Sequence, residues 1–284
     1  MTRQTETGAA DWNDRAVLYG YGLFETMRVY RGVPFVFDAH LDRLEASLSS
    51  LALNRVPNRV AYRRDVLALA ASLDEGAIRL MVTAGNPDMD VAPTHHVAVR
   101  ALPYSPRLYA TGATVCMARE PRNELSMLCR HKTLNQLQNI IEWQAAVKAG
   151  SLDCLFLNTT GHLAEGSRSN VFIVKQGRLI TPSLSCGILP GIARLMVLDL
   201  ARQAGLFVTE APVTTADLFS SDECFLTNSL AEVLPVRQIG TARPQHCPGP
   251  ITSLLAQRYR QCTDGVTPYA LPSLLLSECG DSRT

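Results

Sequence analysis

Long hydrophobic runs and an excess of charge of one sign are both missing from this sequence of 284 residues. No stretch approaches the roughly 20 apolar residues that a membrane span needs. The polar residues at positions 1–8 lack the apolar core of a secretory signal. The formal net charge is +1, which offers no basic face for nucleic acid or an anionic membrane. We therefore expect a cytoplasmic protein that binds neither nucleic acid nor a membrane.

Paired cysteines are missing as well. The chain has 8 cysteines, but none forms a C-x-x-C pair and no histidine is spaced with them as in a zinc site. We expect free thiols in a reducing compartment, several of them buried, and no bound metal. The apolar share of 46% and the charged share of 19% are typical of a folded globular protein. The length allows one large domain or two medium ones.

The hydrophobic periodicity predicts an α+β or mixed α/β fold with short strands and no internal repeat. In the first part we expect strands over residues 23–30, 33–37, 77–83 and 96–102, and helices over residues 38–48 and 59–72. In the second part we expect strands over residues 113–118, 154–158, 170–175 and 223–227, and helices over residues 133–149, 192–204 and 251–260.

The best candidate for a boundary is the segment of residues 103–112. Its two prolines and one glycine discourage regular structure. We therefore predict a small N-terminal α/β domain at residues 1–104, an interdomain linker at residues 105–112 and a larger C-terminal domain at residues 113–284.

Lys132 lies in a basic stretch with Arg130 and His131, just ahead of the helix predicted from Thr133. A lysine forms a Schiff base only when its amine is neutral part of the time. Neighbouring cations and a helix N-terminus both lower the pKa of such an amine. Taken alone, however, a lysine of this kind is more often a solvated surface charge.

Four further features could serve a phosphorylated pyridine cofactor. Glu165 could keep a pyridine nitrogen protonated, and Arg43 could bind a phosphate. The Gly-containing segment 187–194 enters a helix and offers backbone N–H groups to an anion. Asn228 and Ser229 end an apolar run with hydrogen-bonding groups. Each feature alone also fits an ordinary loop acid, helix-face arginine, loop-to-helix junction or polar turn.

Together and in this order, the features resemble the fold-type IV pyridoxal-phosphate (PLP) enzymes, also known as the class IV aminotransferase family. The resemblance runs from about Asp14 to Ile239. Its blocks are residues 14–30, 40–44, 132–135, 164–172, 181–194 and 222–229. Several blocks in one order are far more specific than any of them alone.

The resemblance implies a role for each block. Lys132 would carry the cofactor, pyridoxal 5'-phosphate, as a Schiff base and would act as the catalytic base. Glu165 would pair with the pyridine nitrogen of the cofactor. The other cofactor-binding residues would be Arg43, Leu189, Ile192, Ala193, Asn228 and Ser229. The fold would be the two-domain, D-amino-acid aminotransferase-like one, with PLP between the domains. The family also implies a homodimer with the active site near the interface.

The reaction stays open within the family. Ala84 stands where D-amino-acid enzymes usually carry an arginine for the substrate carboxylate, whereas residues 83–85 and 227–229 look more like bacterial 4-amino-4-deoxychorismate lyases. We therefore expect a lyase that eliminates pyruvate and forms 4-aminobenzoate, a step of folate biosynthesis. The alternatives are an aminotransferase acting between a branched-chain or D-amino acid and a 2-oxo acid, and a non-catalytic PLP-fold binding protein. Arg28 and Arg79 are candidates for binding the carboxylate of a small amino substrate.

Overall fold

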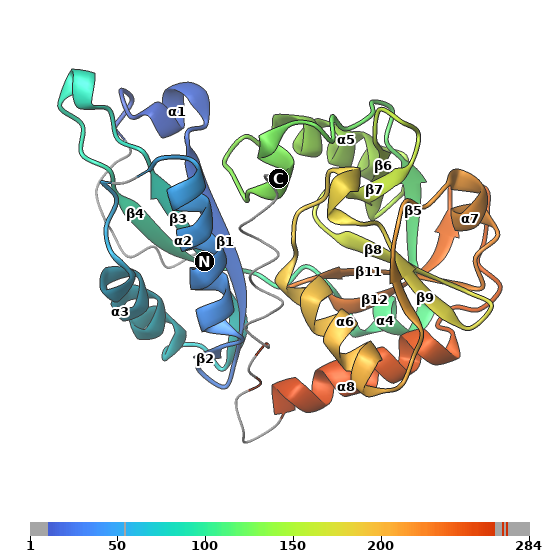
Figure 1. Ribbon diagram of the computed structural model, residues 1–284. Helices are drawn as coiled ribbons and strands as arrows, with labels where there is room; N and C mark the ends of the chain where they lie inside the picture. Colours follow the sequence, from blue (N-terminus) through green and yellow to red (C-terminus); the bar gives the residue numbers. More distant parts are fainter. Residues whose placement is uncertain (1–10, 54, 265–268, 270, 272–284) are drawn as a thin grey trace. The chain divides into compact units, whose positions relative to one another are not determined.

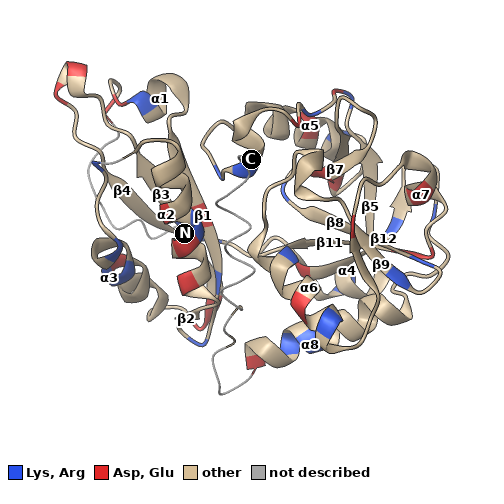
Figure 2. Ribbon diagram, viewed as in Figure 1, with Lys and Arg blue, Asp and Glu red and all other residues tan. Residues whose placement is uncertain are grey.

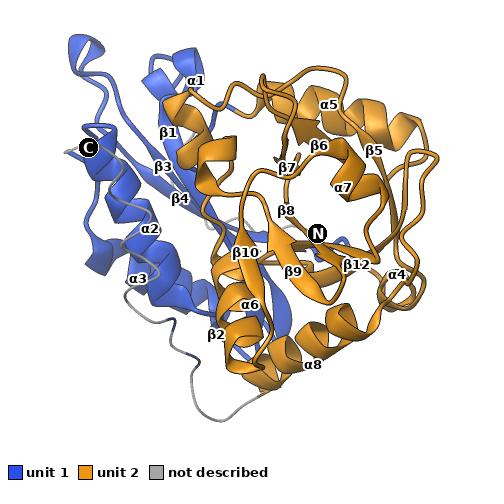
Figure 3. Cartoon of the chain, turned by 45° about the vertical axis from the view of Figure 1, so that its right-hand side comes forward, with its two compact units in different colours: residues 1–103, 131–135, 268–284 blue, residues 104–130, 136–267 orange. Residues whose placement is uncertain are grey.

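The computed structural model describes residues 11–53, 55–264, 269 and 271. Residues 272–284, which include Cys279, lie outside the described residues. The described chain divides into two compact units (Figure 3). Unit 1 contains residues 11–103 together with His131–Asn135, and unit 2 contains Tyr104–Arg130 and residues 136–264.

Unit 1 is a four-stranded sheet with two helices over one face (Figure 1). Its strand order is β2-β1-β3-β4, and the paired strands are antiparallel. The elements are α1 (Arg15–Tyr19), β1 (Gly22–Tyr30), β2 (Val33–Pro34), α2 (Phe37–Ser50), α3 (Arg59–Ala70), β3 (Glu75–Thr83), the short 3-10 helix η1 (Pro87–Met89) and β4 (His95–Arg100).

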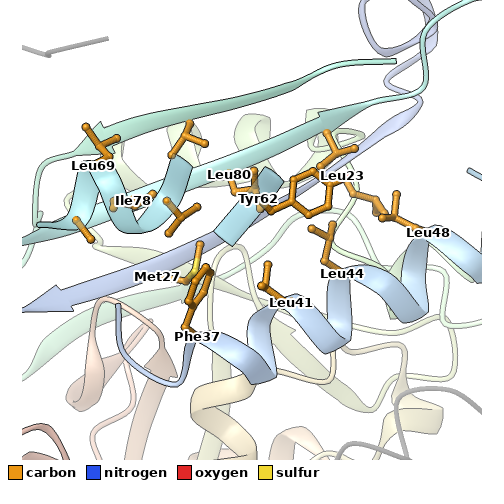
Figure 4. Close-up of a cluster of buried hydrophobic side chains, with 14 of the residues drawn as sticks. Leu23, Met27, Phe37, Leu41, Leu44, Leu48, Tyr62, Leu69, Ile78 and Leu80 are labelled. Atoms are coloured by element: carbon orange, nitrogen blue, oxygen red, sulfur yellow. The ribbon is translucent and has the colours of Figure 1, made fainter. Parts of the chain in front are cut away.

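The two faces of this sheet differ in character because strand side chains alternate. Leu23 and Met27 of β1 are buried with Leu41 of α2 and Tyr62 of α3 in one apolar cluster (Figure 4). The alternate residues of β1, which include Phe24 and the other even-numbered positions up to Tyr30, belong to the opposite face. Phe24 and Arg79, described below, belong to that opposite face, whereas Glu25 belongs to the face that packs on α2.

Unit 2 is an eight-stranded mixed sheet with the order β10-β9-β8-β11-β12-β5-β6-β7. Its strands are β5 (Ala113–Met117), β6 (Asp153–Leu157), β7 (Leu163–Gly166), β8 (Asn170–Lys175), β9 (Arg178–Thr181), β10 (Val208–Glu210), β11 (Glu223–Asn228) and β12 (Glu232–Ile239). Its helices are α4 (Pro106–Thr111), η2 (Met127–Arg130), α5 (Leu137–Lys148), η3 (Leu184–Cys186), α6 (Ile192–Gln203), α7 (Thr215–Phe219) and α8 (Pro250–Asp264).

The core of unit 2 consists of apolar side chains from the sheet and its covering helices. Val115, Leu155, Val171 and Leu226 are all buried within it. Within the described residues, no helix combines the length and the apolar character that a bilayer crossing requires.

Three local predictions are wrong, and all concern where helices begin. The helix predicted from Thr133 begins at Leu137, because residues 132–134 pair with β1 instead. Helix α2 begins at Phe37, one residue before the predicted start, so the predicted strand of residues 33–37 is only β2. Residues 106–111 form α4 rather than irregular chain, because Pro106 is tolerated in a first helical turn.

The predicted boundaries at residues 104 and 112 stay a prediction. By compactness, residues 104–112 group with unit 2, and His131–Asn135 groups with unit 1 although unit 2 flanks it on both sides in the sequence. His131–Asn135 belongs to unit 1 because the backbone of residues 132–134 is hydrogen-bonded to the first residues of β1.

Candidate active site

Lys132 lies beside the first residues of β1. The N–H of Phe24 donates to the Lys132 carbonyl at 2.9 Å, and the N–H of Leu134 donates to the Gly22 carbonyl at 2.9 Å. The Lys132 amine lies 4.6 Å from the centroid of the Phe24 ring. A lysine carried on paired backbone and held against an aromatic ring has a fixed place, unlike a solvated surface lysine.

The chain offers few alternatives to Lys132, since its other lysines are Lys148 and Lys175. Lys148 is exposed in the last turn of α5. Lys175 forms an ion pair with Asp217 at 2.7 Å on the surface of unit 2. Within the described residues, neither lies over an aromatic ring as Lys132 does.

Arg79 contacts the same aromatic ring as Lys132. Its guanidinium lies 4.4 Å from the Phe24 centroid, and its Nε is buried without a hydrogen-bond partner in the described structure. Burial lowers the pKa of Arg79, and Arg100 adds to this effect. Arg28, the other candidate for a carboxylate, stacks on Tyr30 at 4.8 Å and lies 3.7 Å from Glu75. Of the two arginines, the structure therefore brings Arg79 to Lys132.

Arg43 is buried on α2 against Glu25 of β1. The Arg43 Nε donates to Glu25 Oε1 at 2.8 Å, and Nη2 donates to Oε2 at 2.6 Å. His40 Nδ1 lies 2.7 Å from the same Oε2. All three side chains are at most 4% exposed. The predicted phosphate ligand thus has a fixed guanidinium orientation, supplied by a carboxylate.

The electrostatics of this cluster favour an ionised Glu25 and a neutral His40. Burial alone would raise the pKa of Glu25, but the Arg43 charge and the His40 hydrogen bond outweigh it and lower that pKa to about 2. Burial lowers the pKa of His40, and the Arg43 and Lys132 charges act in the same direction against the opposing effect of Glu25. Arg43 and Glu25 therefore form a tightly held ion pair with an uncharged imidazole beside it.

Glu165 is buried at the end of β7 in unit 2. Its Oε1 accepts from Arg122 Nη1 at 2.5 Å. Its Oε2 accepts from the Leu189 N–H at 2.9 Å and from the Asn170 amide at 3.0 Å. Three donors, one of them a cation, hold this carboxylate in one orientation. Glu165 is thus a buried, firmly held carboxylate rather than an exposed loop acid.

The segment before α6 approaches Asn170 so closely that only glycine fits. A Cβ on Gly191 would lie 2.0 Å from Asn170 Oδ1. The Asn170 amide also donates to the Leu189 carbonyl at 3.0 Å, which ties this segment to β8. Gly191 is the N-cap residue of α6, and no side chain caps the helix. The predicted phosphate ligands Ile192 and Ala193 are its first two residues.

Asn228 ends β11 and organises the turn that follows. Its Oδ1 accepts from the N–H groups of Leu230 and Ala231 at 2.9 and 2.7 Å. Its amide donates to Tyr104 Oη at 3.0 Å. Its neighbour Thr227 is fully buried, and the Thr227 hydroxyl has no hydrogen-bond partner in the described structure. Ser229 follows in the same turn.

Each unit, taken by itself, holds side chains that suit one part of PLP. In unit 1, Lys132 offers an amine and Arg43 a fixed guanidinium. In unit 2, Glu165 offers a buried carboxylate for a pyridine nitrogen, and α6 offers a helix start without a side-chain cap, as phosphate requires. The unpartnered hydroxyl of Thr227 is a buried polar atom of the kind that a ligand satisfies.

The Amino-transferase class IV family matches residues 22–239. The chain belongs to this family. Its fold is the fold-type IV architecture, and it is a PLP-dependent enzyme of the class IV aminotransferase and lyase family. The expectation of a PLP enzyme is confirmed, and a binding protein without turnover is no longer needed as an alternative.

Relatives with different activities are about equally similar. A Methanocaldococcus jannaschii protein provisionally named a branched-chain-amino-acid aminotransferase is 35% identical over 258 residues, 87% of this chain and 88% of that protein. The D-alanine aminotransferase of Listeria monocytogenes is 31% identical over 268 residues, 90% of this chain and 91% of the enzyme.

Two solved structures make the same point. The 4-amino-4-deoxychorismate lyase of Pseudomonas aeruginosa has a TM-score of 0.81 and 28% identity, covering 92% of this chain and 98% of the lyase. A hypothetical aminotransferase of Mycobacterium tuberculosis in its PLP-bound form has a TM-score of 0.81 and 27% identity, covering 92% of this chain and 95% of that one. The shared fold therefore does not select one reaction.

Sequence reasoning missed three residues of these clusters. Glu25 carried a usable signal, because it is a charged residue in phase with Leu23 and Met27 on the buried face of a strand. Phe24 lay in the same predicted strand without any sign of its contact with Lys132. Arg122 lies in a polar segment with no periodic pattern, so only the structure reveals its contact with Glu165.

Proposed function

We propose that Lys132 is the lysine that bonds to PLP, and that Arg43, Glu165, Leu189, Ile192, Ala193, Asn228 and Ser229 bind the cofactor. When bound, PLP supplies an electron sink for negative charge formed at the substrate carbon. The part of this chain is to hold and move a proton. The Lys132 amine takes the proton from that carbon, and Glu165 keeps the pyridine nitrogen protonated.

The substrate we propose carries two carboxylates. The observation behind this proposal is the pair of cations on the Phe24 ring, Lys132 at 4.6 Å and Arg79 at 4.4 Å. An arginine whose Nε is buried without a partner is costly unless an anion meets it. Arg28 lies on the same sheet face and supplies a second guanidinium. We propose that one carboxylate of the substrate meets Arg79 and that the other meets Arg28, which also lies 3.7 Å from Glu75.

The reaction we propose is elimination of pyruvate from 4-amino-4-deoxychorismate to give 4-aminobenzoate. That substrate carries two carboxylates, one on the ring and one on the enolpyruvyl group. A branched-chain amino acid has a single carboxylate, so it would leave one of the two arginines without one. Ala84, which is buried, replaces the arginine expected of D-amino-acid enzymes, and residues 227–229 resemble those of the lyases.

Amino transfer is the second candidate. It is favoured by the relatives at 35% and 31% identity, which carry aminotransferase names. A dicarboxylic 2-oxo acid as the amino acceptor would also satisfy Arg79. The two candidates share every proposed cofactor contact and differ in the substrate and in the step that follows removal of its proton.

The test supplies the PLP-reconstituted enzyme with aminodeoxychorismate and measures 4-aminobenzoate and pyruvate. In parallel, L- and D-amino acids are offered with 2-oxoglutarate. Formation of both lyase products supports our proposal, and amino transfer without 4-aminobenzoate contradicts it.

The variant Arg79→Met should raise the KM for aminodeoxychorismate roughly 30-fold, as expected for loss of a charge-assisted contact. The control is Arg64→Met, at an exposed position on α3.

We also propose that the enzyme is a cytoplasmic homodimer with the active site near the interface. The seven cysteines of the described chain are all free thiols, which supports a reducing compartment. Helix α5 exposes apolar side chains, with Leu137 at 71%, Ile140 at 47% and Ile141 at 46% exposure. A second copy of the chain covering this face would remove them from water.

A further inference from the structure

The backbone of Arg122 is fixed by hydrogen bonds of its own, apart from the contacts of the side chain. It lies between β5 and η2, and its N–H donates to the Leu157 carbonyl at 2.8 Å. A further backbone bridge joins it to Asn158 at the end of β6. The residue is only 7% exposed. A buried arginine with this much backbone support is part of the framework of unit 2.

The guanidinium of Arg122 joins Glu165 to the start of α5. Nη1 donates to Glu165 Oε1 at 2.5 Å, and Nη2 donates to Asn139 Oδ1 at 3.0 Å. The Asn139 amide in turn donates to the Ser167 carbonyl at 2.8 Å, two residues beyond Glu165. The guanidinium also lies 4.8 Å from the Phe156 ring centroid. Its position is therefore set from several sides.

The charge of Arg122 determines where a shared proton lies. Suppose that a buried carboxylate and a pyridine nitrogen share one proton. A cation beside the carboxylate stabilises the form in which the carboxylate is ionised and the nitrogen carries the proton. Without that cation, burial favours the neutral form, with the proton on the carboxyl group. Only the first form lets the ring withdraw electrons effectively.

We propose that Arg122 is a positioning residue that keeps Glu165 ionised and in one orientation, so that the pyridine nitrogen of PLP carries the proton. This inference rests on the proposed pairing of Glu165 with that nitrogen. Arg122 touches Glu165 rather than the reacting atoms, so it acts through the carboxylate. The inference applies equally to a lyase and to an aminotransferase.

The experiment reads the protonation of the ring directly. The enzyme is reconstituted with PLP labelled with ¹⁵N in the ring, and the nitrogen chemical shift is followed from about pH 6 to pH 9. We expect a protonated nitrogen throughout in the wild type. In Arg122→Met the protonated population should fall by about half or more, and Arg122→Lys should restore most of it because it keeps the charge.

The matched control is Arg119→Met, three residues earlier. Arg119 also pairs with a glutamate, Glu142, at 3.0 Å, but it does not contact Glu165. This variant should leave the nitrogen shift unchanged. In Arg122→Met we also expect kcat to fall roughly 10- to 100-fold, as for lost supporting contacts elsewhere, with little change in KM.

Two results would overturn the inference in different ways. A protonated nitrogen in both the wild type and Arg122→Met would remove the role of Arg122 and leave that of Glu165 intact. An unprotonated nitrogen in the wild type would remove the pairing of Glu165 itself, and with it this inference. If Arg122→Met does not fold, Arg122→Gln replaces it, because it keeps a donor for Glu165 without the charge.

Discussion

Glu25 links the strand next to Lys132 with the predicted phosphate ligand Arg43. In Glu25→Gln, the two charge-assisted bonds to Arg43 become one weaker contact, so Arg43 loses its fixed orientation. We expect the dissociation constant for PLP to rise about 10-fold, as measured by titrating the apoenzyme. The control is Glu45→Gln, on helix α2, which carries Arg43. Equal affinities in the wild type and Glu25→Gln would contradict the role of Glu25.

The same residue predicts a pH dependence of stability. The pKa of Glu25 falls from its ordinary value of 4.5 to about 2 in the folded protein. The unfolded chain therefore binds this proton more readily, and the stabilisation is complete above pH 4.5 and is lost as the pH falls toward 2. Glu25→Gln should lack this component in unfolding curves measured against pH.

Thr227 allows a cleaner test of the phosphate contacts. Because its hydroxyl has no partner in the described protein, Thr227→Val should leave the unfolding free energy of the apoenzyme unchanged or slightly higher. If the hydroxyl binds the phosphate, PLP affinity should fall about 10-fold. A loss of apoenzyme stability without a loss of affinity would show a structural role instead. Calorimetry and PLP titration separate the two outcomes.

At the residue scale, sequence reasoning located groups that belong to recognisable blocks and missed their partners. Lys132 and Glu165 were predicted through the order of the blocks. Arg122 was not, because its contact with Glu165 depends on how β6, β7 and α5 pack together. Local sequence does not encode such a long-range contact.

At the element scale, α8 depends on one buried carboxylate at the start of β11. Glu223 Oε2 accepts from the Thr252 N–H at 2.7 Å and the Thr252 hydroxyl at 2.6 Å, and Oε1 accepts from the Ile251 N–H at 3.0 Å. This carboxylate caps the helix and attaches it to the sheet.

We therefore expect Glu223→Ala to lower the unfolding free energy by about 2 kcal/mol, at the upper end for a lost cap. Urea unfolding measures this change. The absorbance of bound PLP should stay the same, because the Glu223 carboxylate bonds to Ile251 and Thr252 and not to a proposed cofactor ligand. A lost cofactor signal in a folded variant would contradict a purely structural role.

Strands and buried helices were predictable because their periodicity is local. β8 was predicted with its exact bounds, and α6 to within one residue. The start of α5 was not, because residues 132–134 bond to β1, which lies more than a hundred positions earlier in the chain. That error concerned the segment that carries Lys132. The backbone conformation around the proposed catalytic lysine therefore could not be predicted from the sequence.

At the scale of the whole molecule, charges of both signs are mixed over the elements (Figure 2). Arg59 of α3 pairs with Asp38, Asp42 and Glu45 of α2. Such networks stabilise the contact between surface helices modestly and weaken with salt. They do not distinguish one activity from another.

The proposed homodimer is tested on α5. Ile140→Glu would place a charge within a covered apolar face, so the dimer should weaken by at least 10-fold in its dissociation constant, roughly 1.4 kcal/mol. Light scattering after size-exclusion chromatography measures the mass. Phe207→Glu, at an exposed apolar position elsewhere in unit 2, is the control. A wild-type monomer would contradict the dimer, and an unaffected Ile140→Glu dimer would contradict this interface.

The central claim is that Lys132 carries the cofactor, and a chain with only three lysines permits a decisive measurement. The enzyme is reconstituted with PLP, reduced with borohydride and digested, and the modified peptide is identified by mass spectrometry. We predict a single pyridoxyl label on Lys132, and no visible absorbance band from bound PLP in Lys132→Ala. A label on Lys148 or Lys175, or an unchanged band in Lys132→Ala, would contradict the account.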